Sequence, residues 1–466
     1  MYGTQALGER PSVRTMTDVF TGAGYRLYLV GGCVRDSILA QAQGRPVDFA
    51  DLDFTTNAPV EAIEELLSLA SSQGRPPGSG ALWLAGRQYG TIGAVVAGDK
   101  IEVTRHRCDY YDDPTTRRPR VVFGNDIYGD LARRDLTINA IAAELTPGPD
   151  GASAQIVDPF GGCDDLVSGV IRTPGDAGSI IAEDPLRAAR ALRFLARFGD
   201  HLSTDLERAI VAHRDRMGIL SGERVRDELV KLIDLGGAKT ARALREAERL
   251  GIATYMLGGL HLSEKVATVI AQLDDSDVIL EALVYQNCGT TSPRSDGGHR
   301  EADYRRLHRM GLGGRVDLEL ALAEARNSPA ASALRRLKFP SSKIAKALST
   351  AVLAEHIIGL VPSEHEARRL AHELGPGPVR RALTLARAFN DDAVPIEPLF
   401  ERTILEHPGL VGPLPIDGED LVAVGMCGPN VRYGLDAARA ALYRQPTSTK
   451  PELLHAALTW DVAGGP

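Results

Sequence analysis

The sequence predicts an α+β protein, in which a small region of mixed strands and helices precedes a long all-α portion. Strand-like and helix-like segments alternate from about residue 25 to residue 143. From about residue 184 onward, strand signals are scarce and helical periodicity dominates. Because the chain has 466 residues, too many for one ordinary core, we expect several domains.

The elements of the mixed region follow from local patterns. Apolar, β-prone runs predict strands, and Pro59, which lies near a first helical turn, marks the start of a helix. The expected elements are strands over 25–30 and 51–55, helices over 34–39 and 61–70, and a hairpin of 90–96 and 100–105 around Gly98-Asp99. We interpret residues 71–80 as a Gly-, Pro- and Ser-rich loop and the polar stretch 109–126 as a mobile loop.

Composition narrows the class of protein. No apolar run reaches the roughly 18 residues that a membrane span requires, and the N-terminus lacks a signal-peptide pattern. The five cysteines are scattered and form no CxxC pair, so neither a zinc site nor a disulfide framework is indicated, and a cytoplasmic location fits. The net charge of −8 argues against a uniformly basic surface, although a local basic groove can still bind nucleic acid.

The first candidate site combines a glycine turn with two carboxylates. Gly31-Gly32 precedes Arg35, and Asp51 and Asp53 follow on the next predicted strand. Residues i and i+2 of a strand share a face, so these two carboxylates project side by side and suit Mg²⁺. Glycines let backbone N–H groups approach a phosphate. The set suggests nucleotidyl transfer, and the alternative is a strand, a glycine turn and surface acids.

Two further segments are dense in functional side chains. Arg133-Arg134-Asp135 with Asn139 can grip phosphates or a ribose, although Asp135 could instead cap a helix. Glu183-Asp184-Pro185 begins a helix on which Arg187, Arg190 and Arg193 recur every third residue. Capping explains Glu183 to Pro185 but not the arginines, because like charges in a row destabilise a helix unless an anion pairs with them. Asp184 and Arg187 could read the edge of a base.

Together these segments resemble the class II tRNA nucleotidyltransferase (CCA-adding enzyme) family, in the polymerase-beta-like superfamily. Strong similarity runs from about residue 25 to residue 232. The motifs occur in the family's order: Gly31-Gly32-x-x-Arg35-Asp36, Asp51-x-Asp53, Gly86-x-x-x-Gly90-Thr91, Glu102-Val103-Thr104, Arg133-Arg134-Asp135-x-Thr137-x-Asn139-Ala140, Asp158-Pro159-Phe160-Gly161-Gly162, Glu183-Asp184-x-x-Arg187-x-x-Arg190, Gly222-Glu223-Arg224-x-x-x-Glu228-Leu229 and Leu414-Pro415-Ile416-x-Gly418-x-Asp420-Leu421.

The resemblance implies a polymerase-beta-like head over 1–157, followed by an all-α neck over 158–255, body over 256–373 and tail over 374–466. It implies addition of CCA to the 3′ end of tRNA from CTP and ATP, by two-metal transfer with Mg²⁺, and no obligate protein partner. The roles carried over by motif are as follows: Asp51 and Asp53 bind Mg²⁺; Gly31, Gly32 and Arg35 bind the triphosphate; Arg133, Arg134, Asp135 and Asn139 hold the ribose; Glu183 orients Arg187, which reads C and A with Asp184; Arg190 and Arg193 complete the pocket.

The sequence allows more than one interpretation of some residues and of the function. Glu102 is either a third catalytic carboxylate near the metals or a partner of Arg105 or Arg107. Three features depart from the family. The stretch from Asp36 to Asp51 is longer than usual and contains Asp48, and no His is followed directly by Asp. In addition, residues 256–410 match no motif of the family. A CC-only or A-only enzyme, a bacterial poly(A) polymerase and a non-catalytic RNA-binding relative are the alternatives. The segment 86–91 and the acidic charge favour the tRNA enzyme over the polymerase, and an intact loop over 109–126 favours full CCA addition.

Overall fold

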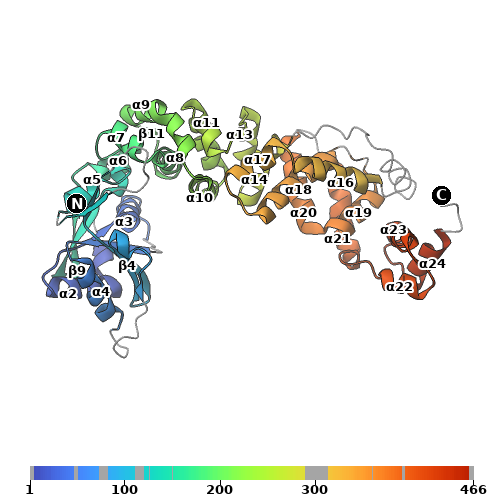
Figure 1. Ribbon diagram of the computed structural model, residues 1–466, viewed down its shortest axis with the longest axis horizontal. Coiled ribbons are helices and arrows are strands. Elements are labelled where there is room, and N and C mark those ends of the chain that lie inside the picture. Colours follow the sequence, from blue (N-terminus) through green and yellow to red (C-terminus); the bar gives the residue numbers. More distant parts are fainter. Residues whose placement is uncertain are drawn as a thin grey trace. The chain divides into compact units, whose positions relative to one another are not determined.

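The chain divides into two compact units, of residues 1–220 with 246–252 and of residues 221–245 with 253–466. The computed structural model (Figure 1) describes residues 5–46, 51–72, 82–110, 120–124, 126–149, 151–288, 313–358, 360, 362–390 and 394–460. The prediction of several domains is consistent with this division, and the finer boundaries of head, neck, body and tail stay a prediction.

The first unit is built on a seven-stranded sheet of order β3-β4-β5-β2-β1-β8-β9. Neighbouring strands are antiparallel except β2 and β5, which are parallel. The bounds are β1 Leu27–Val30, β2 Asp51–Thr56, β3 Leu82–Trp83, β4 Thr91–Val96, β5 Asp99–Arg105, β8 Ala142–Gly148 and β9 Gly151–Val157.

Alternation along β2 separates a buried face of this sheet from an open one. Leu52 and Phe54 are buried, whereas Asp51 and Asp53 are exposed. Helices α2 (Pro11–Gly22) and α4 (Val60–Ser71) pack together and contact strands of the sheet, and both are seen in the blue part of Figure 1. The open face therefore carries the carboxylates, while the apolar side chains of the same strand contribute to the core.

The rest of the first unit consists mainly of helices and two small sheets. The ribbon of β6 (Arg107–Tyr110) and β7 (Arg120–Phe123) is antiparallel, and β10 (Val170–Ile171) pairs in parallel with β11 (His201–Leu202). The helices are α1 Gln5–Gly8, α3 Gly32–Ala42, η1 Arg87–Tyr89, α5 Ile127–Ala132, η2 Thr137–Asn139, α6 Gly162–Ser168, α7 Ala177–Glu183, α8 Leu186–Phe198, α9 Thr204–His213 and η3 Arg214–Ile219.

The second unit is helical throughout its described residues. Its elements are α10 Gly222–Ile233, α11 Gly237–Arg249, α12 Ala253–Met256, α13 Glu264–Ile270, α14 Ser276–Tyr285, α16 Gly313–Ala325, α17 Pro329–Arg336, α18 Ser341–Ile358, α19 Glu364–Leu374, α20 Pro376–Phe389, α21 Ile396–Glu406, η4 Pro408–Leu410, α22 Gly418–Ala423, α23 Pro429–Arg444 and α24 Lys450–Trp460. Residues 246–249 at the end of α11 belong to the first unit. In the described parts of either unit, no helix is long and apolar enough to cross a membrane.

The α+β class is confirmed, as are the predicted strands, the two helices and the hairpin of the mixed region. One interpretation was wrong at its flanks: residues expected to lie in a loop over 109–126 belong to the ribbon of β6 and β7. Residues 111–119 and 125, which form the centre of that expected loop, lie outside the described residues, as do Asp48 and 73–81.

Glu281 is a buried carboxylic acid in the second unit, on α14 between the packed helices α18 and α20. Its Oε1 accepts a hydrogen bond from Thr350 at 2.9 Å and lies 3.5 Å from Nε of Arg381, whereas Oε2 has no partner. Burial raises the pKa of Glu281 to about 7, although Thr350, Arg381 and Lys346 lower it, while Asp277 adds to the rise. The protonated acid is therefore the form that this site favours.

The pKa of Glu281 predicts that the second unit loses stability as pH rises from about 4.5 to about 7. Below this window both the folded and the unfolded chain hold the proton. Within it only the folded chain does, so deprotonation favours unfolding, by an amount on the order of 3 kcal/mol. Urea titrations at pH 5 and pH 8 check this, with Glu281→Gln as the matched control that cannot titrate. An equal pH dependence in both proteins would contradict the prediction.

Candidate active site

Three acidic side chains project from neighbouring strands on the open face of the sheet. The parallel pairing of β2 with β5 places Asp53 beside Glu102 and Asp51 beside Lys100. These four residues, with Leu52 and Trp83, line a cavity of about 450 Å³. The predicted side-by-side arrangement of the two aspartates is present, and Glu102 faces the same cavity. Arg105 lies over the ring of Phe123 at 4.9 Å, and Arg107 donates to the backbone oxygen of Tyr89.

The charges in this cavity fit a divalent cation. Although Asp53 is open to solvent on one side, partial desolvation of its carboxyl group within the cavity raises its pKa, as do the neighbouring carboxylates of Glu102 and Asp51, and Arg134 opposes them. A cation placed between the carboxylates would relieve this repulsion. No group of three His, Cys, Asp or Glu side chains within the described residues is arranged to hold a metal ion. Mg²⁺ requires no such cage, because it usually takes one or two carboxylates and completes its shell with water and substrate phosphates.

Gly31 places backbone and an arginine next to the carboxylates. It precedes α3 with a positive φ of 75°, a conformation that favours glycine. A β-carbon added at this position would lie 3.4 Å from Nη1 of Arg134 and 3.8 Å from Oδ2 of Asp53. The turn therefore brings the guanidinium of Arg134 toward the carboxylate of Asp53.

Arg35, which was expected to contact phosphate, is buried and held by protein groups. Its Nε donates to Asp36 at 2.8 Å and its Nη1 donates to Oδ1 of Asn139 at 2.6 Å. The guanidinium also lies 4.3 Å from the ring centre of Phe198. These contacts tie the first turn of α3 to Asn139 and to α8, so the structure supports a positioning role more directly than a phosphate contact.

Asp130, which the motif analysis did not single out, holds both arginines of the Arg133-Arg134 pair. Its Oδ1 accepts from Nη2 of Arg133 at 2.7 Å, and its Oδ2 lies 3.4 Å from Nη2 of Arg134. Burial alone would raise the pKa of Asp130. The two arginines lower it by more than burial raises it, so the pKa lies below its usual value. The spacing of three and four residues was a signal for these pairs, because such residues are neighbours on a helix.

Asp135 is the centre of a second buried network. Its Oδ2 accepts from Nε of Arg190 at 2.7 Å, while its Oδ1 accepts from Leu136 N at 2.9 Å and Nδ2 of Asn139 at 3.0 Å. Burial opposes ionisation, but Arg190 and Asn139 outweigh it and lower the pKa of Asp135. The alternative of a helix capped by Asp135 is wrong, since only a short 3₁₀ turn follows and Leu136 precedes it.

The arginine-rich helix α8 begins one residue later than expected, with Pro185 preceding it. Asp184 accepts from Leu186 N at 3.2 Å. Arg187 donates to Glu183 at 3.2 Å and to the backbone oxygen of Arg133 at 3.0 Å. Arg193 is buried, 4.5 Å from the ring centre of Phe194. Arg187 and Arg190 pair with Glu183 and Asp135, so the prediction that these two arginines need an external anion was wrong.

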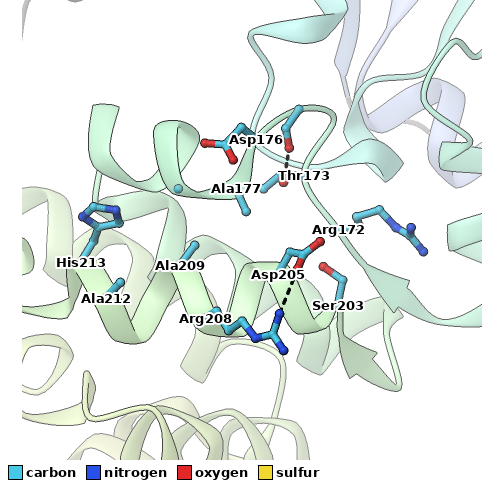
Figure 2. Close-up of a pocket in the computed structure, with 12 residues that line it drawn as sticks. Arg172, Thr173, Asp176, Ala177, Ser203, Asp205, Arg208, Ala209, Ala212 and His213 are labelled. Atoms are coloured by element: carbon cyan, nitrogen blue, oxygen red, sulfur yellow. Dashed lines mark hydrogen bonds and ion pairs between the residues drawn. The ribbon is translucent and has the colours of Figure 1, made fainter.

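A separate hollow of about 420 Å³ lies between α7 and α9 and contains none of the predicted site residues. Figure 2 shows Asp176, Asp205, Arg208 and His213 around it, with the pair of Asp205 and Arg208 dashed at 3.7 Å. Asp176 caps α7 by accepting from Ser179 N. These acidic groups already serve local structure, so the cavity that contains Asp51 and Asp53 is the better candidate for chemistry.

Comparison with known families and proteins finds matches over about half of the chain. Residues 27–172 match the poly A polymerase head domain, and residues 201–263 match a family described as the probable RNA and SrmB-binding site of polymerase A. The CCA-adding enzyme of Geobacillus thermodenitrificans is 36% identical over 244 residues, which are 52% of each chain. That of Geobacillus stearothermophilus is 36% identical over 237 residues, 50% of this chain and 52% of its own. The alignments thus span about half the length of these curated relatives.

Solved structures extend the likeness of fold to almost the whole chain. The Bacillus stearothermophilus CCA-adding enzyme in complex with CTP aligns with a TM-score of 0.64 and 25% identity, covering 97% of this chain and 98% of its own. The Thermotoga maritima CCA-adding enzyme complexed with tRNA has a TM-score of 0.59 at 19% identity, covering 97% and 96%. The predicted resemblance and the predicted fold are confirmed.

Proposed function

We propose that this chain, which belongs to the tRNA nucleotidyltransferase/poly(A) polymerase family through its N-terminal half, adds CCA to the 3′ end of tRNA. CTP and ATP would be the substrates and pyrophosphate the leaving group. The observation that carries the proposal is the placement, within one compact unit, of a carboxylate cavity on β2 and β5 and a network of arginines and acids on α8 and η2. Residues 27–172, which include this cavity, match the poly A polymerase head domain, and the relatives that align over about half of the chain are CCA-adding enzymes.

Asp51 and Asp53 would hold divalent metal, with Mg²⁺ the cation that their oxygen ligands suit best. Bound there, the metal would supply positive charge that lowers the pKa of the tRNA 3′ hydroxyl and stabilises the departing pyrophosphate. Glu102 faces the same cavity and would add negative charge that strengthens cation binding. Arg134, beside Gly31, would balance the phosphate charge on the other side of Asp53.

The nucleotide would lie against the arginine network. Arg133 and Arg134, both oriented by Asp130, are suited to the ribose and phosphates. Glu183 and the backbone oxygen of Arg133 fix Arg187, whose planar guanidinium would donate hydrogen bonds to the base beside Asp184. Asp135, Asn139, Arg35, Arg190 and Arg193 would keep this wall rigid. We place the activity in the cytoplasm, where tRNA, CTP and ATP occur together, and assign tRNA binding to the helical neck, body and tail.

The direct test is incorporation of labelled nucleotides. The protein would be incubated with Mg²⁺, tRNA lacking its CCA end and all four NTPs, with a different one of them labelled in each reaction. We expect CMP and AMP to be added, three nucleotides in all, with UTP and GTP as negative controls. Addition of CMP alone or AMP alone would identify a partial enzyme, and long A tails on unrelated RNA a poly(A) polymerase. No incorporation at all, beside an active reference enzyme, would contradict the proposal.

Arg187→Ala should weaken nucleotide selection more than metal binding. Removing the fork leaves the base edge unread, so preference for CTP and ATP over UTP and GTP should fall about tenfold or more. Arg187→Lys keeps the charge but loses the planar fork, and it should behave similarly. Competition assays with mixed NTPs measure the preference, with exposed Arg208→Ala as the matched control. An unchanged preference in both Arg187 variants would remove the base-reading role.

A further inference from the structure

One row of residues crosses the open face of the sheet from its aromatic edge to its carboxylates. The strand registers pair Trp83 with Gly93, Gly93 with Glu102, and Glu102 with Asp53. Paired residues of adjacent strands lie on the same face. Trp83, Glu102 and Asp53 therefore project to one side, and all three line the same cavity of about 450 Å³.

Gly93 makes room for the indole of Trp83 in this row. A β-carbon added at Gly93 would collide with Nε1 and the neighbouring ring carbons of Trp83, so the indole lies directly over the glycine. In this position the side chain spans β4 toward Glu102. Trp83 nevertheless remains 36% exposed. A partly open aromatic ring beside the carboxylates offers a face on which a planar partner can stack.

The charges around Asp53 distinguish its two sides. On the β1 side lie the Gly31 turn and Arg134, which suit the triphosphate. On the β5 side lie Glu102 and then Trp83, and Lys100 is the basic residue of the cavity lining. In an in-line phosphoryl transfer, the attacking and leaving oxygens occupy opposite sides of the phosphorus. The attacking strand should therefore approach from the side of Trp83.

We propose that Trp83 is the binding platform for the RNA primer, and that its indole stacks on the terminal base whose 3′ hydroxyl attacks. This inference rests on the proposed function and adds the site of its second substrate. Stacking suits the task because every base has an aromatic face, so the platform tolerates different bases. A primer that grows by one nucleotide at each addition presents a new terminal base each time.

The kinetic test separates the primer from the nucleotide. Trp83→Ala should raise KM for tRNA lacking CCA about tenfold, the range expected for one lost stacking contact, and leave KM for CTP unchanged. Trp83→Phe should restore most of the affinity. Gly93→Ala should reproduce the defect with Trp83 still present, because it displaces the indole. Leu84→Ala, at the exposed neighbouring residue, is the matched control. Equal KM for tRNA in wild type, Trp83→Ala and Gly93→Ala would overturn the proposal.

A binding test needs no catalysis. The chain has two tryptophans, so Trp460→Phe leaves Trp83 as the single reporter. Addition of an acceptor-arm RNA that ends just before CCA should quench its fluorescence. Unchanged emission at saturating RNA, with binding verified by anisotropy of a labelled RNA, would refute the platform. If the wild-type protein adds nucleotides but RNA does not quench Trp83, only the platform is refuted. If RNA quenches Trp83 but no nucleotide is added, only the proposed function is refuted.

Discussion

Asp53→Asn is expected to reduce nucleotide addition by at least about a thousandfold, because the metal would lose a charged ligand at the reacting centre. The substitution is nearly isosteric and lies on the open face of β2, where Asp53 is exposed. The buried alternation of Leu52 and Phe54 is untouched, so the fold should persist. Removing a carboxylate that Glu102 and Asp51 repel should even favour the metal-free protein slightly. Single-turnover addition of CMP to tRNA lacking CCA measures the loss.

Binding data decide whether this loss is chemical. RNA affinity should not fall in Asp53→Asn, because the carboxylate that is removed repels phosphate when no metal is bound. The apparent Mg²⁺ requirement should rise. Asp99→Asn, at the start of β5, is a control acid outside the cavity lining, where it pairs with Arg10. Near-normal activity of Asp53→Asn at saturating Mg²⁺ would rule out its proposed role as a metal ligand.

The sequence predicted the arrangement of the two aspartates because that arrangement depends on local geometry. The period of two along a strand places Asp51 beside Asp53 whatever the rest of the fold does. The partners of the arginines on α8 were harder to predict. Spacing showed Arg187 and Arg190 on one side of a helix, but the acid that pairs with Arg190 is Asp135, 55 residues earlier. Helix spacing identifies only partners that are near in sequence, whereas tertiary structure brings Asp135 to Arg190.

The elements that were missed also depend on long-range pairing. The ribbon of β6 and β7 joins Arg107–Tyr110 to Arg120–Phe123, and the first of these strands is too polar to suggest β-structure. The two-residue strand β3 gives no periodic signal, so the position of Trp83 over Gly93 depended on register. Hydrophobic patterning specified the long helices and the central strands, whereas contacts between short polar segments required the folded chain.

Asp135→Ala is expected to lower the free energy of unfolding of the first unit by about 3 kcal/mol, the usual cost of removing one partner of a buried, hydrogen-bonded ion pair. The carboxylate satisfies three donors, from Arg190, Asn139 and Leu136 N, and the variant would leave all of them without it. Asn139 in turn accepts from Arg35, so the defect should spread to the first turn of α3. Urea denaturation followed by circular dichroism measures the loss.

A double-mutant cycle would show whether the loss comes from the pair of Asp135 and Arg190. Arg190→Ala should be milder on its own, because Asp135 would keep Asn139 and Leu136 N. The double variant should cost less than the sum of the two single changes, since each already removes the shared interaction. Additive losses would show that the two side chains act independently. This pair joins the turn after Arg134 to the helix that carries Arg187. Coupling between its two side chains would therefore also link the ribose side of the proposed pocket to its base-reading side. KM for CTP should rise in both single variants.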